Sequence, residues 1–176
     1  MLTGKMQEML NLQINKEIYS AYLYVSMSAY SEHTGLKGFA NWFMVQYQEE
    51  MEHAMRIYLY ILEQAGKINL LTIERPPNDF ASPLDLFEKT LAHEKIVTKS
   101  INDLMDLAVQ SKDHASQIFL QWFVTEQIEE ESNPAEIINQ LKLVGTDGNG
   151  LFMIDKELAT RVFTPQLGQG AQASPA

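Results

Sequence analysis

Residues 48–56, with the sequence QEEMEHAMR, place three glutamates and a histidine inside a segment that is otherwise rich in Phe, Tyr, Met and Ile. Glu50 and His53 are three residues apart, so on a helix they share one face with the apolar residues around them. Burying an unpaired carboxylate is costly, because the charge loses its hydration. The stretch therefore predicts a helix whose buried face carries charge that a cation must neutralise.

Helical periodicity extends over most of the chain. Apolar residues recur every three or four positions through four segments, at residues 4–33, 37–65, 84–111 and 114–144. The intervening stretch GKINLLTIERPPNDFAS, residues 66–82, is too long for a tight hairpin, and fully extended it could span about 56 Å. A helix of about 30 residues is roughly 45 Å long. We predict an all-α, four-helix bundle with a long crossover between the second and third helices, and a short fifth helix at about 150–161.

Three further features concern the ends and breaks of these segments. Gly66 is expected to end the second helix, and Ser82-Pro83 to cap and start the third. Pro134 lies inside the fourth segment, where it removes a backbone hydrogen bond, and it predicts a kink or break near Ser132-Asn133. We expect one domain at residues 1–163 and a disordered tail at residues 164–176, TPQLGQGAQASPA, from its small and polar composition.

Composition narrows the function classes. The chain of 176 residues has no cysteine, which excludes a disulfide and a thiolate metal site. A formal net charge of -10 argues against nucleic-acid binding and is compatible with attracting cations. No apolar run approaches the length needed to cross a bilayer, and no signal peptide precedes the first helix. We expect a cytoplasmic protein without a membrane or nucleic-acid partner.

Each predicted helix carries polar residues on its apolar stripe. They are Glu17 in the first, Glu50 and His53 in the second, Glu94 in the third, and Gln127 and Glu130 in the fourth. Glu17 and Glu50 are 33 residues apart, as are Glu94 and Gln127, so the two hairpins form a pseudo-repeat with these groups at nearly one height. Carboxylates this crowded require a cation, and oxygen ligands with one imidazole suit a pair of iron or manganese ions. Glu50, at the centre of the set, is the candidate bridging ligand.

With Glu50-x-x-His53 on one helix and Gln127-x-x-Glu130 on another, the chain resembles the bacterial non-haem ferritins over residues 1–163. The resemblance implies that Glu17, Glu50 and His53 bind one iron, that Glu50, Glu94 and Glu130 bind a second, and that Gln127 lies beside them. It makes Tyr24 a neighbouring tyrosine able to donate an electron. A third, weaker iron position is implied at Glu49, Glu126, Glu129 and Glu130.

The same resemblance implies a function. Members of the family oxidise Fe(II) with dioxygen or peroxide and store the ferric mineral in a cage of 24 subunits. Haem is not expected, because bacterioferritins carry a histidine where this chain has Glu130, although Met51 occupies the position of their haem ligand. Rubrerythrins are excluded by the lack of cysteine.

Two other functions stay open at this point. One is a di-iron or di-manganese oxygenase or catalase on the same scaffold, and the other is a helical interaction module with structural glutamates. Glu126 and Glu129 lie in the run EQIEEE, which could also be a solvated helix face. Tyr24 and Trp122 could be ordinary core aromatics. The other histidines, His33, His93 and His114, are expected at helix ends or on the surface.

Overall fold

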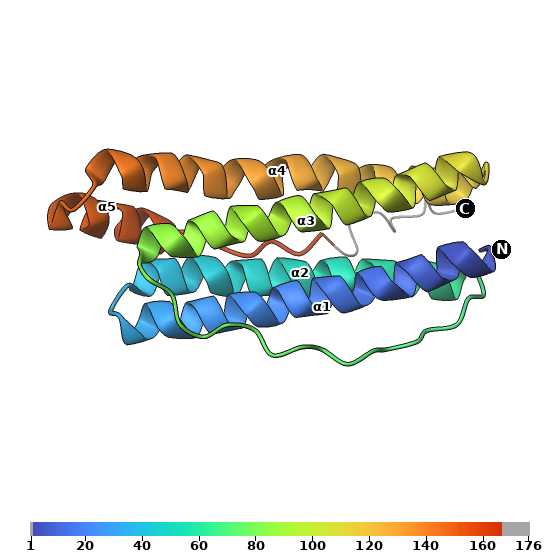
Figure 1. Cartoon of the computed structure of the whole chain (residues 1–176), viewed down its shortest axis with the longest axis horizontal. Helices are drawn as coiled ribbons and strands as arrows, with labels where there is room; N and C mark the ends of the chain where they lie inside the picture. The colour runs from blue at the N-terminus through green and yellow to red at the C-terminus, as the bar shows by residue number, and fades with distance from the viewer. Residues whose placement is uncertain (1, 167–176) are drawn as a thin grey trace, which may run out of the picture.

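The computed structural model describes residues 2–166, which contain five helices and no strand (Figure 1). The helices are α1 (Gly4–His33), α2 (Lys37–Glu63), α3 (Pro83–Gln110), α4 (His114–Val144) and α5 (Gly148–Leu158). The predicted all-α class and the four-helix bundle with a short fifth helix are confirmed. Residues 164–166 have no regular secondary structure, and the rest of the predicted tail lies outside the described residues.

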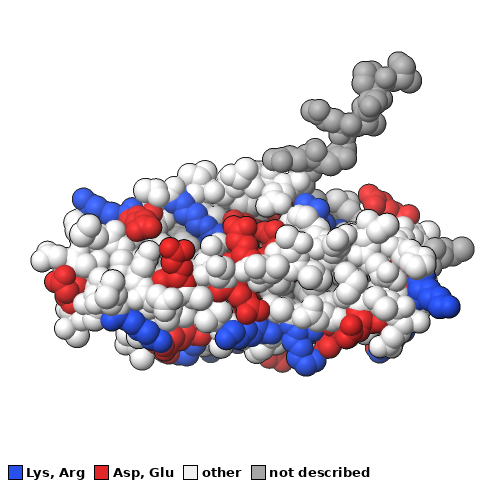
Figure 2. Space-filling view, turned by 90° about the horizontal axis from the view of Figure 1, so that it is seen from above, with Lys and Arg blue, Asp and Glu red and all other residues white. Residues whose placement is uncertain are grey.

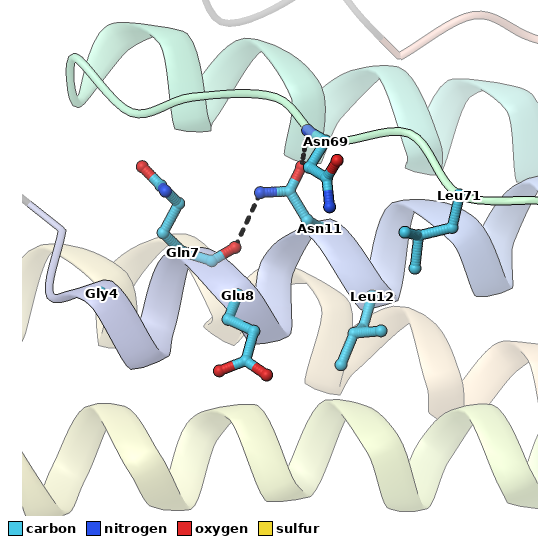
Figure 3. A pocket seen from close by; sticks show the side chains of 7 residues that line it. All are labelled: Gly4, Gln7, Glu8, Asn11, Leu12, Asn69 and Leu71. Atoms are coloured by element: carbon cyan, nitrogen blue, oxygen red, sulfur yellow. Dashed lines mark hydrogen bonds between the residues drawn. The ribbon is translucent and has the colours of Figure 1, made fainter.

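The bundle consists of two antiparallel hairpins, α1 with α2 and α3 with α4 (Figure 1). The segment between α2 and α3 runs the full length of the bundle beside α1, as its extended length predicted. Asn11 on α1 holds this crossover near its start, because its amide donates to the carbonyl of Lys67 (3.0 Å) and its Oδ1 accepts from the N–H of Asn69 (2.7 Å; Figure 3). Asn11 and Asn69 also line a pocket of about 360 Å³ near the beginning of α1.

Two helix ends follow the predicted chemistry with one adjustment. Ser82 caps α3 by accepting the N–H of Asp85 at 3.1 Å, and Pro83 is the first helical residue. At the end of α2, however, the left-handed residue is Ala65, with φ at 57°, and Gly66 follows it. Gly66 is required by close packing instead, since a Cβ there would lie 2.7 Å from Cγ2 of Ile61. Its N–H donates to the carbonyl of Ile61 at 2.8 Å and closes the helix end.

The apolar core is divided into two clusters along the bundle axis. One cluster, with Tyr24, Phe43 and Phe87 at its centre, fills the end nearest α5. The other, with Ile57 and Phe123, fills the end nearest the start of α1. Glu17, Glu50, His53, Glu94 and Glu130, which are buried and come from the four long helices, lie between these clusters, so a water-poor polar layer crosses the middle of the bundle.

The predicted break near Ser132-Asn133 is not present, and the alternative of a kink stays a prediction. Helix α4 continues from His114 to Val144 with Pro134 buried inside it. The proline cannot donate the hydrogen bond that would reach the carbonyl of Glu130, a loss typical of a proline in a helix interior. The remaining backbone bonds and the burial of the α4 face against the bundle hold the helix together through this position.

Helix α5 ends three residues earlier than predicted and docks on the start of α2. No side chain of its own segment caps α2, whose N-cap residue is Leu36. Instead the Asp155 carboxylate of α5 accepts the N–H of Gly38 (2.8 Å) and of Phe39 (3.1 Å). A Cβ on Gly38 would overlap the backbone carbonyl of Asp155, so only glycine permits this approach. Among the helices of residues 2–166, none is long and apolar enough to span a membrane.

The cap between α5 and α2 leads to a stability prediction. Asp155→Ala should lower the free energy of unfolding by about 1 kcal/mol, because two N–H groups at the start of α2 lose their acceptor. Chemical denaturation followed by circular dichroism measures the change. Glu157→Ala, an exposed position on the same helix, is the matched control. Equal denaturation midpoints for the two variants would show that the Asp155 cap contributes nothing.

Candidate metal centre

Six predicted residues meet in the polar layer at the middle of the bundle. Each is buried, with at most 5% of its surface exposed, and all four long helices contribute. The residues are Glu17 from α1, Glu50 and His53 from α2, Glu94 from α3, and Gln127 and Glu130 from α4. The structure thus brings the two hairpins' polar groups to one level, as the repeated spacing of 33 residues predicted.

Two sets of three potential ligands share one carboxylate. Glu17, Glu50 and His53 offer ligand atoms that all lie within 4.8 Å of one another, and so do Glu50, Glu94 and Glu130. Because Glu50 belongs to both sets, it is placed to bridge two ions. Oxygen ligands with a single imidazole suit hard or borderline ions such as iron and manganese.

Amide side chains orient these carboxylates. Gln13 donates to Glu17 at 2.8 Å, and its own oxygen accepts from the hydroxyl of Ser100 at 2.5 Å. Gln46 donates to Glu130 at 2.8 Å. Sequence reasoning missed both glutamines. A signal was present, since Gln13 and Gln46 each precede a buried glutamate by one helical turn and are themselves 33 residues apart.

Gln127 and Tyr24 both contact the carboxylate of Glu94. The Gln127 amide lies 3.4 Å from Oε2 of Glu94 and donates to the hydroxyl of Thr98 at 3.1 Å. Tyr24 donates its phenolic hydrogen to Glu94. Burial, followed by the charge of Glu94, raises the pKa of Tyr24 well above its usual value, so the phenol stays protonated at neutral pH. Tyr24 is thus a hydrogen-bond donor at the centre.

The electrostatics of the layer disfavour four free carboxylate charges, which either protons or a bound cation would neutralise. Burial is the largest cause that raises the pKa of Glu17, of Glu50, of Glu94 and of Glu130, the last to about 7. Repulsion from the other carboxylates raises the pKa of Glu50 and Glu94 further. Burial also lowers the pKa of His53, which keeps the imidazole neutral and able to bind a metal.

Two carboxylate oxygens in the layer have no hydrogen-bond partner among the described residues. Oε2 of Glu17 and Oε2 of Glu50 are buried and without a donor among the described residues. Buried polar atoms are normally satisfied, because leaving one unpaired loses the full solvation of the group. Both oxygens belong to the set with His53, so an ion bound there would satisfy them.

The three further predicted residues are placed differently from one another. Glu126 joins His53 and Glu130 in a third set with ligand atoms within 4.8 Å. Glu49 is half-buried and forms an ion pair with Arg161 at 2.7 Å, and Glu129 is exposed. Burial raises the pKa of Glu49 to about 7, with Arg161 opposing it and the charges of Glu126 and Glu129 adding to it. These acids therefore connect the buried centre to the surface.

Acidic side chains are also visible from outside. Figure 2 shows that they gather near the middle of the face seen from above, with basic side chains between them. A concentration of negative charge at a surface raises the local concentration of cations. This distribution is compatible with cations reaching the centre from the surface.

His93 is less exposed than the prediction of a surface residue implied, because its side chain is partly buried. Its Nε2 lies 2.7 Å from the hydroxyl of Ser20, and its ring packs between those of Tyr19 and Tyr24. Burial lowers the pKa of His93 to about 4. The residue belongs to none of the three candidate ligand sets and packs beside the centre.

Comparison with known proteins agrees with this geometry. A sequence model of the Ferritin family, described as a ferritin-like domain, matches residues 7–144. The chain belongs to the ferritin family. A bacterial non-heme ferritin of Campylobacter jejuni is 40% identical over 156 residues, which cover 89% of this chain and 93% of the relative. A bacterial non-heme ferritin of Staphylococcus aureus is 39% identical over 163 residues, covering 93% of this chain and 98% of the relative.

Solved structures of ferritins superpose closely on this ferritin. An Archaeoglobus fulgidus ferritin engineered into a closed form has a TM-score of 0.92 at 49% identity, and covers 93% of this chain and 100% of its own. An open-pore ferritin from the same archaeon has a TM-score of 0.91 at 48% identity, and covers 92% of this chain and 100% of its own. The bundle and crossover of this ferritin are thus shared with proteins of known structure.

The raised pKa values predict how the metal-free protein responds to pH. A folded-state pKa above the unfolded one means that the folded state holds more protons, so stability falls as pH rises from about 4.5 through the folded value. Glu50→Gln removes one such ionisation. The metal-free variant should melt at a higher temperature than wild type at pH 7.5, and the difference should shrink towards pH 4.5.

Differential scanning calorimetry in the presence of a chelator measures this effect. Glu63→Gln, at an exposed position on the same helix, is the matched control and should leave the melting temperature unchanged. Added Zn²⁺ should then stabilise wild type more than Glu50→Gln. A metal-free Glu50→Gln protein that melts below wild type at pH 7.5 would contradict the predicted electrostatic strain.

Proposed function

We propose that this ferritin oxidises Fe(II) at the centre formed by Glu17, Glu50, His53, Glu94 and Glu130, and stores the ferric product inside a cage of identical subunits. Membership of the ferritin family supports iron storage and Fe(II) oxidation. The observation that carries the assignment of the site is the pair of three-ligand sets that share Glu50. Neither an oxygenase nor a structural interaction module is favoured by these relatives.

The ligands suit the reaction. Each Fe(II) ion bound in the two sets can lose one electron, and two electrons with two protons reduce one dioxygen to hydrogen peroxide. The carboxylates stabilise the higher charge of Fe(III), so oxidation is favoured where Fe(II) is bound. Glu17 and His53 hold one ion, Glu94 and Glu130 hold the other, and Glu50 bridges them. Dioxygen and peroxide are both chemically suitable acceptors.

Side chains around the ligands have supporting roles in this proposal. Gln13 and Gln46 orient Glu17 and Glu130, and Tyr24 holds Glu94 while standing close enough to donate an electron. Gln127 donates to Glu94 and takes the place of the glutamate in the second Glu-x-x-His motif of some ferritin-like centres, and Glu130 takes the place of its histidine. With a single imidazole, the centre is rich in oxygen ligands.

A third iron position is proposed beside the first two, with Glu49, Glu126 and Glu129 together with Glu130 as its ligands. The half-buried Glu126 is already close to His53 and Glu130, and Glu129 reaches the surface. An ion in this position would be held more weakly, because solvent screens its ligands more than those of the buried pair.

Storage requires an assembly, because a single bundle encloses no space for mineral. Large apolar side chains remain exposed on the described chain and are available for contacts between subunits. They include Ile118, Ile128, Leu143, Met153 and Val162, each at least 70% exposed. We propose a cage of 24 subunits that holds iron in the cytoplasm, with no haem and no nucleic-acid or membrane partner.

Substitution of the inner ligands tests the proposal. Glu17→Ala, Glu50→Ala and His53→Ala should each slow the initial oxidation of Fe(II) about tenfold or more, because each removes a ligand from the set on which the first ion depends. Stopped-flow absorbance of Fe(III) measures the rate. Light scattering should give the same large assembly for all variants and wild type. Glu8→Ala, exposed on α1, is the control. Unchanged rates in all three variants would exclude this centre.

Glu129→Ala tests the third position separately. The first turnover should be unchanged, because Glu129 is exposed and lies outside the inner sets. The ratio of iron oxidised to dioxygen consumed should change, since the electron supplied by a third ion is lost. Oxygen electrode measurements with graded additions of Fe(II) give this ratio. If it equals that of wild type, Glu129 does not serve a third iron.

A further inference from the structure

The segment that follows α5 returns along α2 towards the metal centre (Figure 1). We define the C-terminal strap as residues 160–166, which contain no helix or strand. The amide of Asn41 holds the beginning of the strap, donating to the carbonyl of Leu158 (3.2 Å) and of Arg161 (2.9 Å). At its far end the N–H of Gln166 donates to Glu52 at 2.6 Å. The strap is therefore fixed to α2 at both ends, on either side of Glu49.

Arg161 is the charged residue that the strap brings to this surface. Its guanidinium carbon lies 4.7 Å from the ring centre of Trp42, and its Nη2 lies 2.7 Å from Oε2 of Glu49. Only 21% of the Arg161 side chain and 26% of the Glu49 side chain are exposed, so the pair is screened less than a surface salt bridge. The permanent positive charge of Arg161 is thus paired with Glu49, one of the ligands of the proposed third iron position.

Not all hydrogen-bond donors of the Arg161 guanidinium have an acceptor. Its Nη1 is buried and has no hydrogen-bond partner among the described residues, although a guanidinium can donate five hydrogen bonds. An arginine whose only role was to fasten the strap would be expected to pair both terminal nitrogens with acceptors. The contact is therefore one that another cation on Glu49 can displace at moderate cost.

Resting on the proposed function, we infer that Arg161 is a tethered cation that competes with a metal ion for Glu49 and so sets the affinity of the third iron position. Arg161 already occupies Oε2 of Glu49, and a metal ion that binds the same carboxylate is repelled by the guanidinium charge. The coupling is reciprocal: the contact of Arg161 with Glu49 weakens binding of the ion by the same free energy by which the bound ion weakens that contact. Binding of a third ion then releases Arg161 and loosens the strap from α2.

This arrangement separates the roles of the inner and outer positions. Among the described residues, Arg161 forms no hydrogen bond with an inner ligand, although its charge opposes the rise in the pKa of Glu130. The inner sets therefore fill without breaking the contact between Arg161 and Glu49. The outer position fills only at Fe(II) concentrations that overcome the competition. Arg161 is therefore a positioning residue for Glu49. Because of it, occupancy of the third position depends on the Fe(II) concentration.

Isothermal titration calorimetry with Zn²⁺, which does not undergo oxidation, tests the inference on the assembled protein. Wild type should bind two ions tightly per subunit and a third more weakly. Arg161→Gln should tighten the third by about tenfold and leave the first two unchanged, and Arg161→Lys should restore most of the wild-type weakness. Lys142→Gln removes the same charge from an exposed pair with Glu88 and should change nothing.

Two further measurements tie the effect to this contact. In a Glu49→Gln background, Arg161→Gln should no longer alter the third affinity, as a double-mutant cycle requires of a direct pair. Hydrogen exchange of residues 160–166 in wild type should accelerate when the third equivalent of Zn²⁺ is added and not before. A strap that only stabilises the fold would show neither behaviour.

The outcomes distinguish the inference from the function on which it rests. An unchanged or weaker third affinity in Arg161→Gln, with two tight ions and normal Fe(II) oxidation, overturns the competition and leaves the proposed function intact. A wild-type protein that binds no ion pair and oxidises no Fe(II) overturns both.

Discussion

The mutual repulsion of buried carboxylates is the constraint around which this bundle is organised. Glu17, Glu50, Glu94 and Glu130 come from four different helices and lie in one layer between two apolar clusters. The clusters exclude water, so burial raises the pKa of each acid, and weakly screened repulsion raises that of Glu50 and Glu94 further. The same exclusion strengthens the attraction of these groups for a multivalent cation. Iron binding and electrostatic strain are thus two consequences of one arrangement.

Such a layer lowers the stability of the metal-free protein, and the rest of the bundle must offset the loss. The apolar clusters on each side supply the burial, and the amides of Gln13 and Gln46 satisfy carboxylate oxygens that would otherwise lack donors. Two oxygens, on Glu17 and Glu50, remain unpaired. A more stable metal-free protein would lack these acids, which are the proposed ion ligands, so stability and the proposed function oppose each other here.

Contacts between distant parts of the chain connect the centre to the end of the sequence. Helix α2 carries Glu50, the candidate bridging ligand, yet Asp155 of α5 caps the first turn of this helix. The same docking directs the C-terminal strap along α2, so that Arg161 meets Glu49 at the outer edge of the acidic layer. The short fifth helix thus positions charge at the centre in addition to any contact it makes with other subunits.

The sequence alone determined the four long helices, because helical periodicity and capping are local and leave a pattern within a few residues. It also placed Glu17, Glu50, His53, Glu94, Gln127 and Glu130 at one level, since equal spacing in two hairpins fixes equal heights. Only the tertiary structure decided where Arg161, Asp155 and His93 lie, and that α4 continues through Pro134. Their partners lie as far as 120 residues away in the chain, and such contacts depend on how whole helices pack, which no local pattern records.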